Sequence, residues 1–168
     1  MEKALKVIRE LKEKQCINEF AIRGGIAVLY YTEPLLTYDL DIFFIPIDEK
    51  KIDVLAPVYK FLSEKGFKPQ KEYIHIEGVP VQFIPVYNEL VRKAVLNSIE
   101  VLYGKIKTRI IRLEYLAAIM LQVYRAKDRE RLIKIFEDAE VNEKELFQIL
   151  DKFKLKDRYK DFRRKFFE

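Results

Sequence analysis

Hydrophobic residues recur with two different periods along the chain, and each period predicts one type of element. Leu5, Ile8 and Leu11 follow helical spacing, which predicts a helix over residues 2–14. Runs rich in β-branched and aromatic residues predict strands at 17–23, 38–46, 73–76 and 79–86. Glu77-Gly78 separates the last two runs, so these form a predicted hairpin.

The remaining pattern completes a predicted sheet and then becomes entirely helical. We expect short helices at 26–31, 53–65 and 88–96, and two strands within 100–111. From Leu113 onward, four helices are predicted at 113–125, 127–138, 143–153 and 155–167. The pattern therefore predicts an α/β (α+β) fold, with a mixed sheet flanked by helices. It divides into a core at 1–111 and a C-terminal helical subdomain at 112–168.

Composition limits the class of protein without identifying it. Of the 168 residues, 49% are hydrophobic, which is enough for one packed domain. No apolar run approaches the roughly 18–20 residues needed to span a bilayer. Cys16 is the single cysteine, so an intramolecular disulfide cannot form. We therefore expect a soluble, cytoplasmic protein that does not associate with a membrane.

Positive charge is concentrated at the C-terminus. The formal net charge is +5, and residues 151–168 hold eight basic residues against four acidic ones. Such a segment could attract a polyanion such as RNA, and it could equally be the solvated face of a helix. Both interpretations stay open on the sequence.

A glycine pair marks a junction between a predicted strand and a predicted helix. Gly24-Gly25 follows the run INEFAIR. Glycines there allow the backbone to approach a ligand closely, and the free N–H groups that open a helix attract phosphate. Tight turns also require glycine, so the pair alone is a weak signal.

Two aspartates interrupt the apolar run YDLDIFFIP. Asp39 and Asp41 alternate with Leu40, so both point to the same face of the predicted strand, about 7 Å apart along the backbone. Two neighbouring carboxylates in an apolar strand repel each other, and a divalent cation offsets that repulsion. Oxygen ligands suit Mg²⁺ or Mn²⁺. The alternative is that the strand frays here and both carboxylates lie in water.

Taken together, the segment GGIAVLYYTEPLLTYDLDIFF resembles the nucleotidyltransferase superfamily, which shares the polymerase-beta-like fold. The family signature is a glycine pair, a short helix and two alternating carboxylates on the next strand. The form Thr37-x-Asp39-x-Asp41 resembles the small prokaryotic branch related to AbiEii-type nucleotidyltransferases. The similarity extends through residues 77–95 and 112–136 and covers roughly residues 15 to 138.

The resemblance implies a role for each matching residue. Asp39 and Asp41 would bind Mg²⁺ and act in catalysis. The nucleotide-binding residues would include Gly24, Gly25 and Thr37. Lys127 would neutralise the triphosphate, with Asp128 holding it in place, although these two could also form an ordinary ion pair at a helix start. Arg23 and Arg125 are further candidate phosphate contacts.

One residue departs from the family pattern. Gln82 occupies the place where the family often carries a third carboxylate, which helps hold the metal and deprotonates the acceptor. Glutamine cannot act as a base, although its carbonyl oxygen can bind a metal. We therefore keep Gln82 as a candidate metal ligand. Glu72, His75 and Glu77 are candidate substitutes for the missing carboxylate.

The sequence thus favours one function and leaves an alternative. The first is Mg²⁺- or Mn²⁺-dependent transfer of a nucleoside monophosphate from an NTP, with ATP expected, to an unidentified acceptor such as RNA or a protein. The alternative is a catalytically degenerate module, as in a toxin–antitoxin pair, that binds a nucleotide, a partner protein or RNA. No P-loop and no G-x-G-x-x-G pattern is present, so P-loop hydrolysis and dinucleotide redox chemistry are poorly supported.

Overall fold

The computed structural model describes residues 1–32 and 37–168, and all elements below lie within those ranges. The described residues form one seven-stranded sheet and eight helices. The strands are β1 (Ile17–Arg23), β2 (Leu40–Pro46), β3 (Pro69–Gln70), β4 (Tyr73–Ile76), β5 (Val79–Pro85), β6 (Ile99–Tyr103) and β7 (Ile106–Ile110). The helices are α1 (Glu2–Glu13), α2 (Gly24–Tyr31), α3 (Ala56–Glu64), α4 (Glu89–Leu96), α5 (Leu113–Val123), α6 (Ala126–Asp138), α7 (Glu143–Lys152) and α8 (Lys156–Phe166).

The sheet is mixed, as the sequence predicts. Its strand order is β3-β4-β5-β2-β1-β7-β6. β2 pairs antiparallel with β1 and parallel with β5, while β1 pairs parallel with β7. β1 and β2 are therefore central, which explains why Phe43, Phe44 and Ile42 are almost completely buried.

The predicted hairpin is confirmed, and its turn explains its sequence. β4 and β5 pair antiparallel around Glu77 and Gly78, whose φ angles are 50° and 79°. Two consecutive positive φ values are what a two-residue hairpin turn of type I′ requires. The short strand β3, which the sequence did not reveal, pairs with β4 at the edge of the sheet. Pro69 is acceptable there because an edge strand has one unpaired side.

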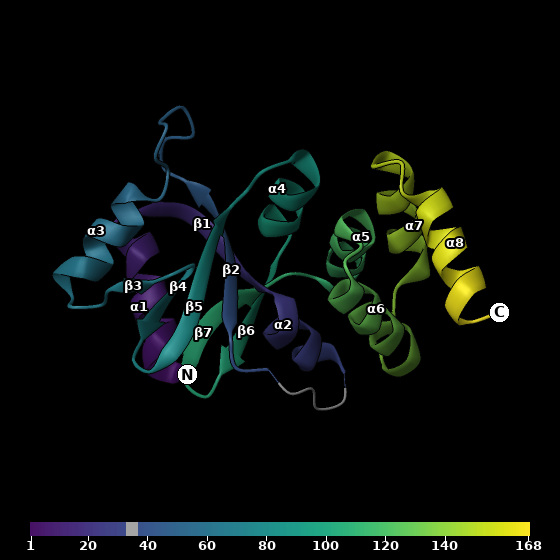
Figure 1. Ribbon diagram of the computed structural model, residues 1–168, viewed down its shortest axis with the longest axis horizontal. Helices are drawn as coiled ribbons and strands as arrows, with labels where there is room; N and C mark the ends of the chain where they lie inside the picture. Colours follow the sequence, from purple (N-terminus) through teal and green to yellow (C-terminus); the bar gives the residue numbers. More distant parts are fainter. Residues whose placement is uncertain (33–36) are drawn as a thin grey trace.

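Helices cover both faces of the sheet (Figure 1). On one face α1 packs against β1 and β7, and an ion pair between Lys65 and Glu10 (2.6 Å) joins α3 to α1. On the other face α2 and α4 pack against β1 and β2. The Asn88 side chain accepts the N–H of Val91 (2.9 Å), which caps the first turn of α4.

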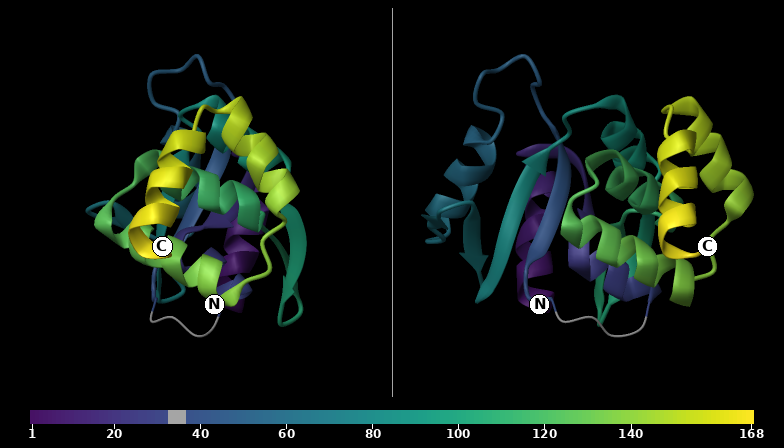
Figure 2. Two further views of the ribbon diagram at one scale, coloured as in Figure 1. Left: turned by 90° about the vertical axis from the view of Figure 1, so that its right-hand side faces the viewer. Right: turned by 45° about the vertical axis from the view of Figure 1, so that its right-hand side comes forward.

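The helical part is built outward from α5, which contacts α4, α6 and α7. Eight of the eleven residues of α5 are buried, so it is a core helix rather than a surface one. α7 and α8 lie side by side at the end of the molecule farthest from β3 and β4 (Figure 2). Phe162 of α8 is fully buried and Tyr159 almost so. The division at residues 111 and 112 stays a prediction.

The structure corrects two element boundaries near the candidate site. β2 begins at Leu40, so Asp39 precedes the strand instead of lying within it. The reason is that β1 ends at Arg23, the partner of Asp41, and the chain then turns into α2, which leaves Asp39 without a partner on that side. α2 begins at Gly24, so the glycine pair forms its first turn.

Within the described ranges, no helix has both the length and the apolar character needed to cross a membrane.

Candidate functional site

A row of polar side chains crosses the four strands β4, β5, β2 and β1. Asp41 pairs with Gln82 on one side and with Arg23 on the other. Ile74 pairs with Val81, which puts Tyr73 beside Gln82 in the next register position. Cross-strand partners point to the same side of a sheet, so these side chains lie on one face: Tyr73, Gln82, Asp41 and Arg23. Gln82 therefore lies directly beside Asp41.

Gly24 is required because the carboxylate of Asp41 occupies the space where a side chain would begin. A β-carbon on Gly24 would lie 2.2 Å from Oδ2 of Asp41, and the φ angle of Gly24 is +70°. Both the close approach and the backbone conformation disfavour a larger residue. Gly24 therefore fixes the position of Asp41 against the start of α2.

Gly25 has a similar role toward a second pair of side chains. A β-carbon there would lie 2.4 Å from Oγ1 of Thr37 and 3.0 Å from Nη2 of Arg131. Both glycines are buried and neither lies on the cavity wall described below. These glycines therefore allow the side chains of the site to approach the backbone closely. Their contact with phosphate stays a prediction.

The first turn of α6 supplies cationic groups that face the strands. Asp128 is only 1% exposed and accepts hydrogen bonds from the backbone N–H of Arg125 (3.0 Å) and from its Nε (2.9 Å). This carboxylate caps the helix and holds the guanidinium of Arg125, rather than Lys127, in place. Lys127 is exposed, whereas Arg131, one turn later, is 7% exposed.

These elements enclose a cavity of about 200 Å³ between the sheet and α6. Of the described residues, its wall contains four cationic side chains and two carboxylates, together with a hydroxyl, a phenol and an amide. The wall residues are Arg23, Thr37, Asp39, Asp41, Tyr73, Gln82, Arg125, Lys127 and Arg131. The cavity is polar and carries an excess of positive charge, which suits a polyanionic ligand.

Burial controls the ionisation of the central groups. Removal from water raises the pKa of Asp41, and Arg23 and Arg131 only partly counteract this effect. Burial likewise lowers the pKa of Arg23 and of Arg131. Among the described residues, neither a hydrogen bond nor an ion pair closer than 4.0 Å connects Asp41 to these arginines. Arg23 instead stacks over the ring of Phe43, 4.6 Å from its centroid, and its buried Nε has no hydrogen-bond partner within residues 1–32 and 37–168.

Tyr73 connects the hairpin to the first aspartate. Burial, the charges of Asp39 and Asp41, and a hydrogen bond with Asp39 raise the pKa of Tyr73. Its hydroxyl therefore stays protonated at neutral pH and can orient the carboxylate of Asp39. Tyr73 had no role in the sequence analysis, because nothing in the run YIHI distinguishes it from a packing residue.

The oxygen donors fit a hard divalent cation of the size of Mg²⁺. Asp39 and Asp41 offer carboxylates and Gln82 offers an amide oxygen in the same cavity. Mg²⁺ is commonly held by one or two carboxylates, with water and substrate phosphates as further ligands. Within residues 1–32 and 37–168, no group of three or more acidic, histidine or cysteine side chains could hold a metal without such help. The donors present suit a metal that arrives together with a nucleotide.

The proposed substitutes for the third carboxylate lie elsewhere. Glu77 is in the hairpin turn and His75 is exposed on β4 opposite Pro80. Glu72 is exposed and is not part of the cavity wall. Arg131, by contrast, lies on the wall although the sequence analysis missed it. Its position four residues after Lys127 on the same helix was the available signal.

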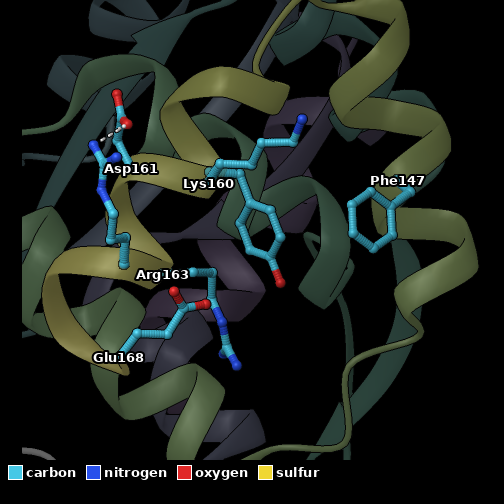
Figure 3. A pocket seen from close by; sticks show the side chains of 7 residues that line it. Phe147, Lys160, Asp161, Arg163 and Glu168 are labelled. Carbon is cyan, nitrogen blue, oxygen red and sulfur yellow. Dashed lines mark hydrogen bonds and ion pairs between the residues drawn. The ribbon is translucent and has the colours of Figure 1, made fainter.

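A larger cavity of about 390 Å³ lies between α7 and α8, and it has a different character (Figure 3). Lys160 and Arg163 face it together with Phe147 and Glu168. An ion pair between Asp161 and Arg164 (3.0 Å), drawn as a dashed line, neutralises part of its rim. Mixed charges on an open surface give no basis for a specific reaction there.

Several basic residues of the C-terminal segment have structural contacts. The guanidinium of Arg163 lies 4.4 Å from the ring centroid of Phe167, and that of Arg158 lies 5.2 Å from the ring centroid of Tyr124. Lys156 pairs with Asp151 at 2.7 Å. These contacts favour packing of α8 as the main role of its arginines.

The comparisons with known proteins identify the fold. The sequence matches no family model and no curated protein. Among solved structures, an antigenic nucleotidyltransferase-like protein from Paracoccidioides brasiliensis superimposes with a TM-score of 0.53, at 15% identity over 79% of this chain and 75% of that one. The antibiotic-resistance factor ANT(2″)-Ia superimposes with a TM-score of 0.51, at 11% identity over 98% of this chain and 97% of that one. The chain therefore has a nucleotidyltransferase-like fold, in agreement with the resemblance found in the sequence.

Proposed function

We propose that this protein is a metal-dependent nucleotidyltransferase that transfers a nucleoside monophosphate from an NTP to an acceptor. The observation that carries the proposal is one cavity whose wall combines Asp39, Asp41 and Gln82 with Arg23, Arg125, Lys127 and Arg131. Oxygen ligands for a metal and cations for phosphates converge there, on a fold that known nucleotidyltransferase-like proteins share. Phosphoryl-transfer sites depend mainly on such charge neutralisation and positioning.

The charge of the cavity matches a metal–nucleotide complex. The cationic side chains exceed the carboxylates by two charges. Together with one divalent cation, that excess balances the charge of a nucleoside triphosphate near neutral pH. The net charge of the wall does not balance the charge of the nucleotide alone or of the metal alone. We therefore expect the nucleotide and the metal to bind cooperatively.

Each side chain has a distinct role in this proposal. Asp39 and Asp41 hold the metal, with Gln82 as a third oxygen donor, and Tyr73 orients Asp39. A bound Mg²⁺ would neutralise the phosphate oxygens and favour displacement at the α-phosphorus. The cationic groups on β1 and α6 bind the β- and γ-phosphates and stabilise the pyrophosphate as it leaves. These groups are Arg23, Arg125, Lys127 and Arg131.

The nucleotide is proposed to be ATP, and the motif Thr37-x-Asp39-x-Asp41 supports placement in the AbiEii-type branch. Thr37 lies on the cavity wall, where its hydroxyl can donate to a phosphate oxygen. A toxin–antitoxin role, with a partner protein and an RNA or protein acceptor, follows from that placement.

Gln82 favours one alternative, a module that binds the nucleotide without transferring it. Incubation with each α-labelled NTP, Mg²⁺ or Mn²⁺ and a pool of cellular RNA, protein and small molecules distinguishes the two. Transfer of label, lost in Asp41→Asn, supports the enzyme. Saturable nucleotide binding without transfer to any fraction supports the module. Absence of both results overturns the proposed function.

A further inference from the structure

We propose that the acceptor presents an anionic oxygen, as in a phosphate monoester, to the Gln82 side of the cavity. The inference rests on the proposed function and specifies its acceptor. It starts from the asymmetry of the row that crosses the sheet. Arg23 and Asp41 carry charge on one side, whereas Gln82 and Tyr73 are neutral on the other.

Among the described residues, the Gln82 side of the cavity has no base dedicated to the acceptor. Gln82 occupies the register position next to Asp41, and glutamine cannot take up a proton. Among the described wall residues, the carboxylates are Asp39 and Asp41, both assigned to the metal. A hydroxyl acceptor gains from a base because its proton must leave during attack. A phosphate monoester has a second pKa of about 6, so it is already ionised at neutral pH.

A neutral side chain at position 82 also favours an anionic acceptor, because it adds no negative charge beside Asp41. A carboxylate at position 82 would repel a phosphate group, whereas the amide of Gln82 can direct its NH₂ group toward a phosphate oxygen. The same side chain can offer its carbonyl oxygen to a metal, so the two roles are compatible.

The reaction balances without proton transfer. The acceptor oxygen forms a bond to the α-phosphorus of the NTP. The bond from that phosphorus to the oxygen bridging the β-phosphate breaks, and pyrophosphate leaves with the electron pair. The product is a phosphoanhydride that joins the nucleoside monophosphate to the acceptor phosphate.

Binding of inorganic phosphate to the nucleotide-loaded protein tests the inference. The full chain is saturated with Mg²⁺ and the α,β-methylene analogue of each nucleoside triphosphate, which occupies the triphosphate site and cannot react. Equilibrium dialysis with labelled phosphate then measures the remaining site. We expect one saturable phosphate site in the wild type, at least tenfold weaker binding in Gln82→Glu, and no competition by glycerol.

Two variants make the comparison specific. Gln148→Glu introduces the same charge on the exposed surface of α7 and should bind phosphate like the wild type. Gln82→Met removes the amide donor without adding charge, so its loss of phosphate affinity should be smaller than that of Gln82→Glu. It also replaces Gln82→Glu in the comparison if that variant fails to fold. The inference is overturned if the nucleotide-loaded wild type binds no phosphate. It is also overturned if the wild type and both Gln82 variants bind phosphate with equal affinity. If the wild type binds none of the α,β-methylene analogues in the presence of Mg²⁺, the proposed function is overturned, and this inference with it.

Discussion

Gly24 and Asp41 are complementary, because the carboxylate of Asp41 occupies the position where a side chain on Gly24 would begin. A β-carbon added to Gly24 would lie 2.2 Å from Oδ2 of Asp41. The glycine that opens α2 and the aspartate on β2 are therefore one structural unit. A substitution at either residue should therefore change the space available to the other.

The first prediction is that Gly24→Ala destabilises the protein and displaces Asp41. The positive φ costs about 1–2 kcal/mol for alanine, and the steric overlap adds about 1–3 kcal/mol. Chemical denaturation measures the total. Gly66→Ala is the matched control, because Gly66 also has a positive φ (+89°) but open space around it.

A double-mutant cycle isolates the overlap. Asp41→Ala removes the carboxylate that a β-carbon at position 24 would meet, so Gly24→Ala should cost less in that background by about 1 kcal/mol or more. Equal costs in the two backgrounds would show that Asp41 does not occupy the space beside Gly24.

The second prediction concerns the pH dependence of stability. Burial raises the pKa of Asp41 in the folded protein above its value in the unfolded chain. The folded state then binds the proton more tightly, so this group lowers the free energy of unfolding as pH rises from about 4 through the folded pKa. Without metal, Asp41→Asn should therefore become more stable relative to wild type as pH rises to 7. If the free energies of unfolding of the two proteins, measured by chemical denaturation, show the same dependence on pH, the raised pKa is contradicted.

The third prediction separates phosphate binding from folding. Lys127 is exposed and makes no ion pair within the described residues, so Lys127→Ala should leave the melting temperature unchanged. It should weaken NTP binding about tenfold at low salt, because an unscreened contact with the triphosphate is lost. Calorimetric titration gives the affinity, and Lys144→Ala, exposed on α7, controls for net charge. Equal NTP affinity in the two variants would show that Lys127 does not contact the nucleotide.

The fourth prediction concerns the basic C-terminal helix. Arg163 lies against the ring of Phe167, and loss of this cation–π contact in Arg163→Gln should destabilise the protein by about 1 kcal/mol. Lys160→Gln removes the same charge from an exposed position nearby and should have little effect. The alternative role in RNA binding makes a different prediction: unchanged stability in both variants and similar losses of salt-sensitive RNA affinity.

The sequence predicted those parts of the site that depend on local pattern. Strand-forming runs placed Gln82 on a strand of the sheet, and the glycine pair and the two aspartates identified the strand–helix–strand unit. These features follow from the geometry of strands and from residue preferences at turns, both of which act over a few residues.

The sequence could not show the contacts made by distant elements. Tyr73 reaches Asp39 only because the hairpin of β4 and β5 pairs with β2 in one particular register. The carboxylate of Asp128 turned out to hold Arg125 rather than Lys127, a choice made by side-chain packing at the start of α6. The start of β2 was misplaced because the end of β1 decides where pairing stops.

The central claim is that Asp39 and Asp41 bind a metal–nucleotide complex, and thermal unfolding tests it most directly. With Mg²⁺ and an NTP together at a hundredfold excess over Kd, wild type should gain about 2.7 kcal/mol of stability, and neither ligand alone should match that gain. The double variant Asp39→Asn, Asp41→Asn should lose the gain while remaining folded. An equal ligand-dependent shift in the double variant would contradict the claim.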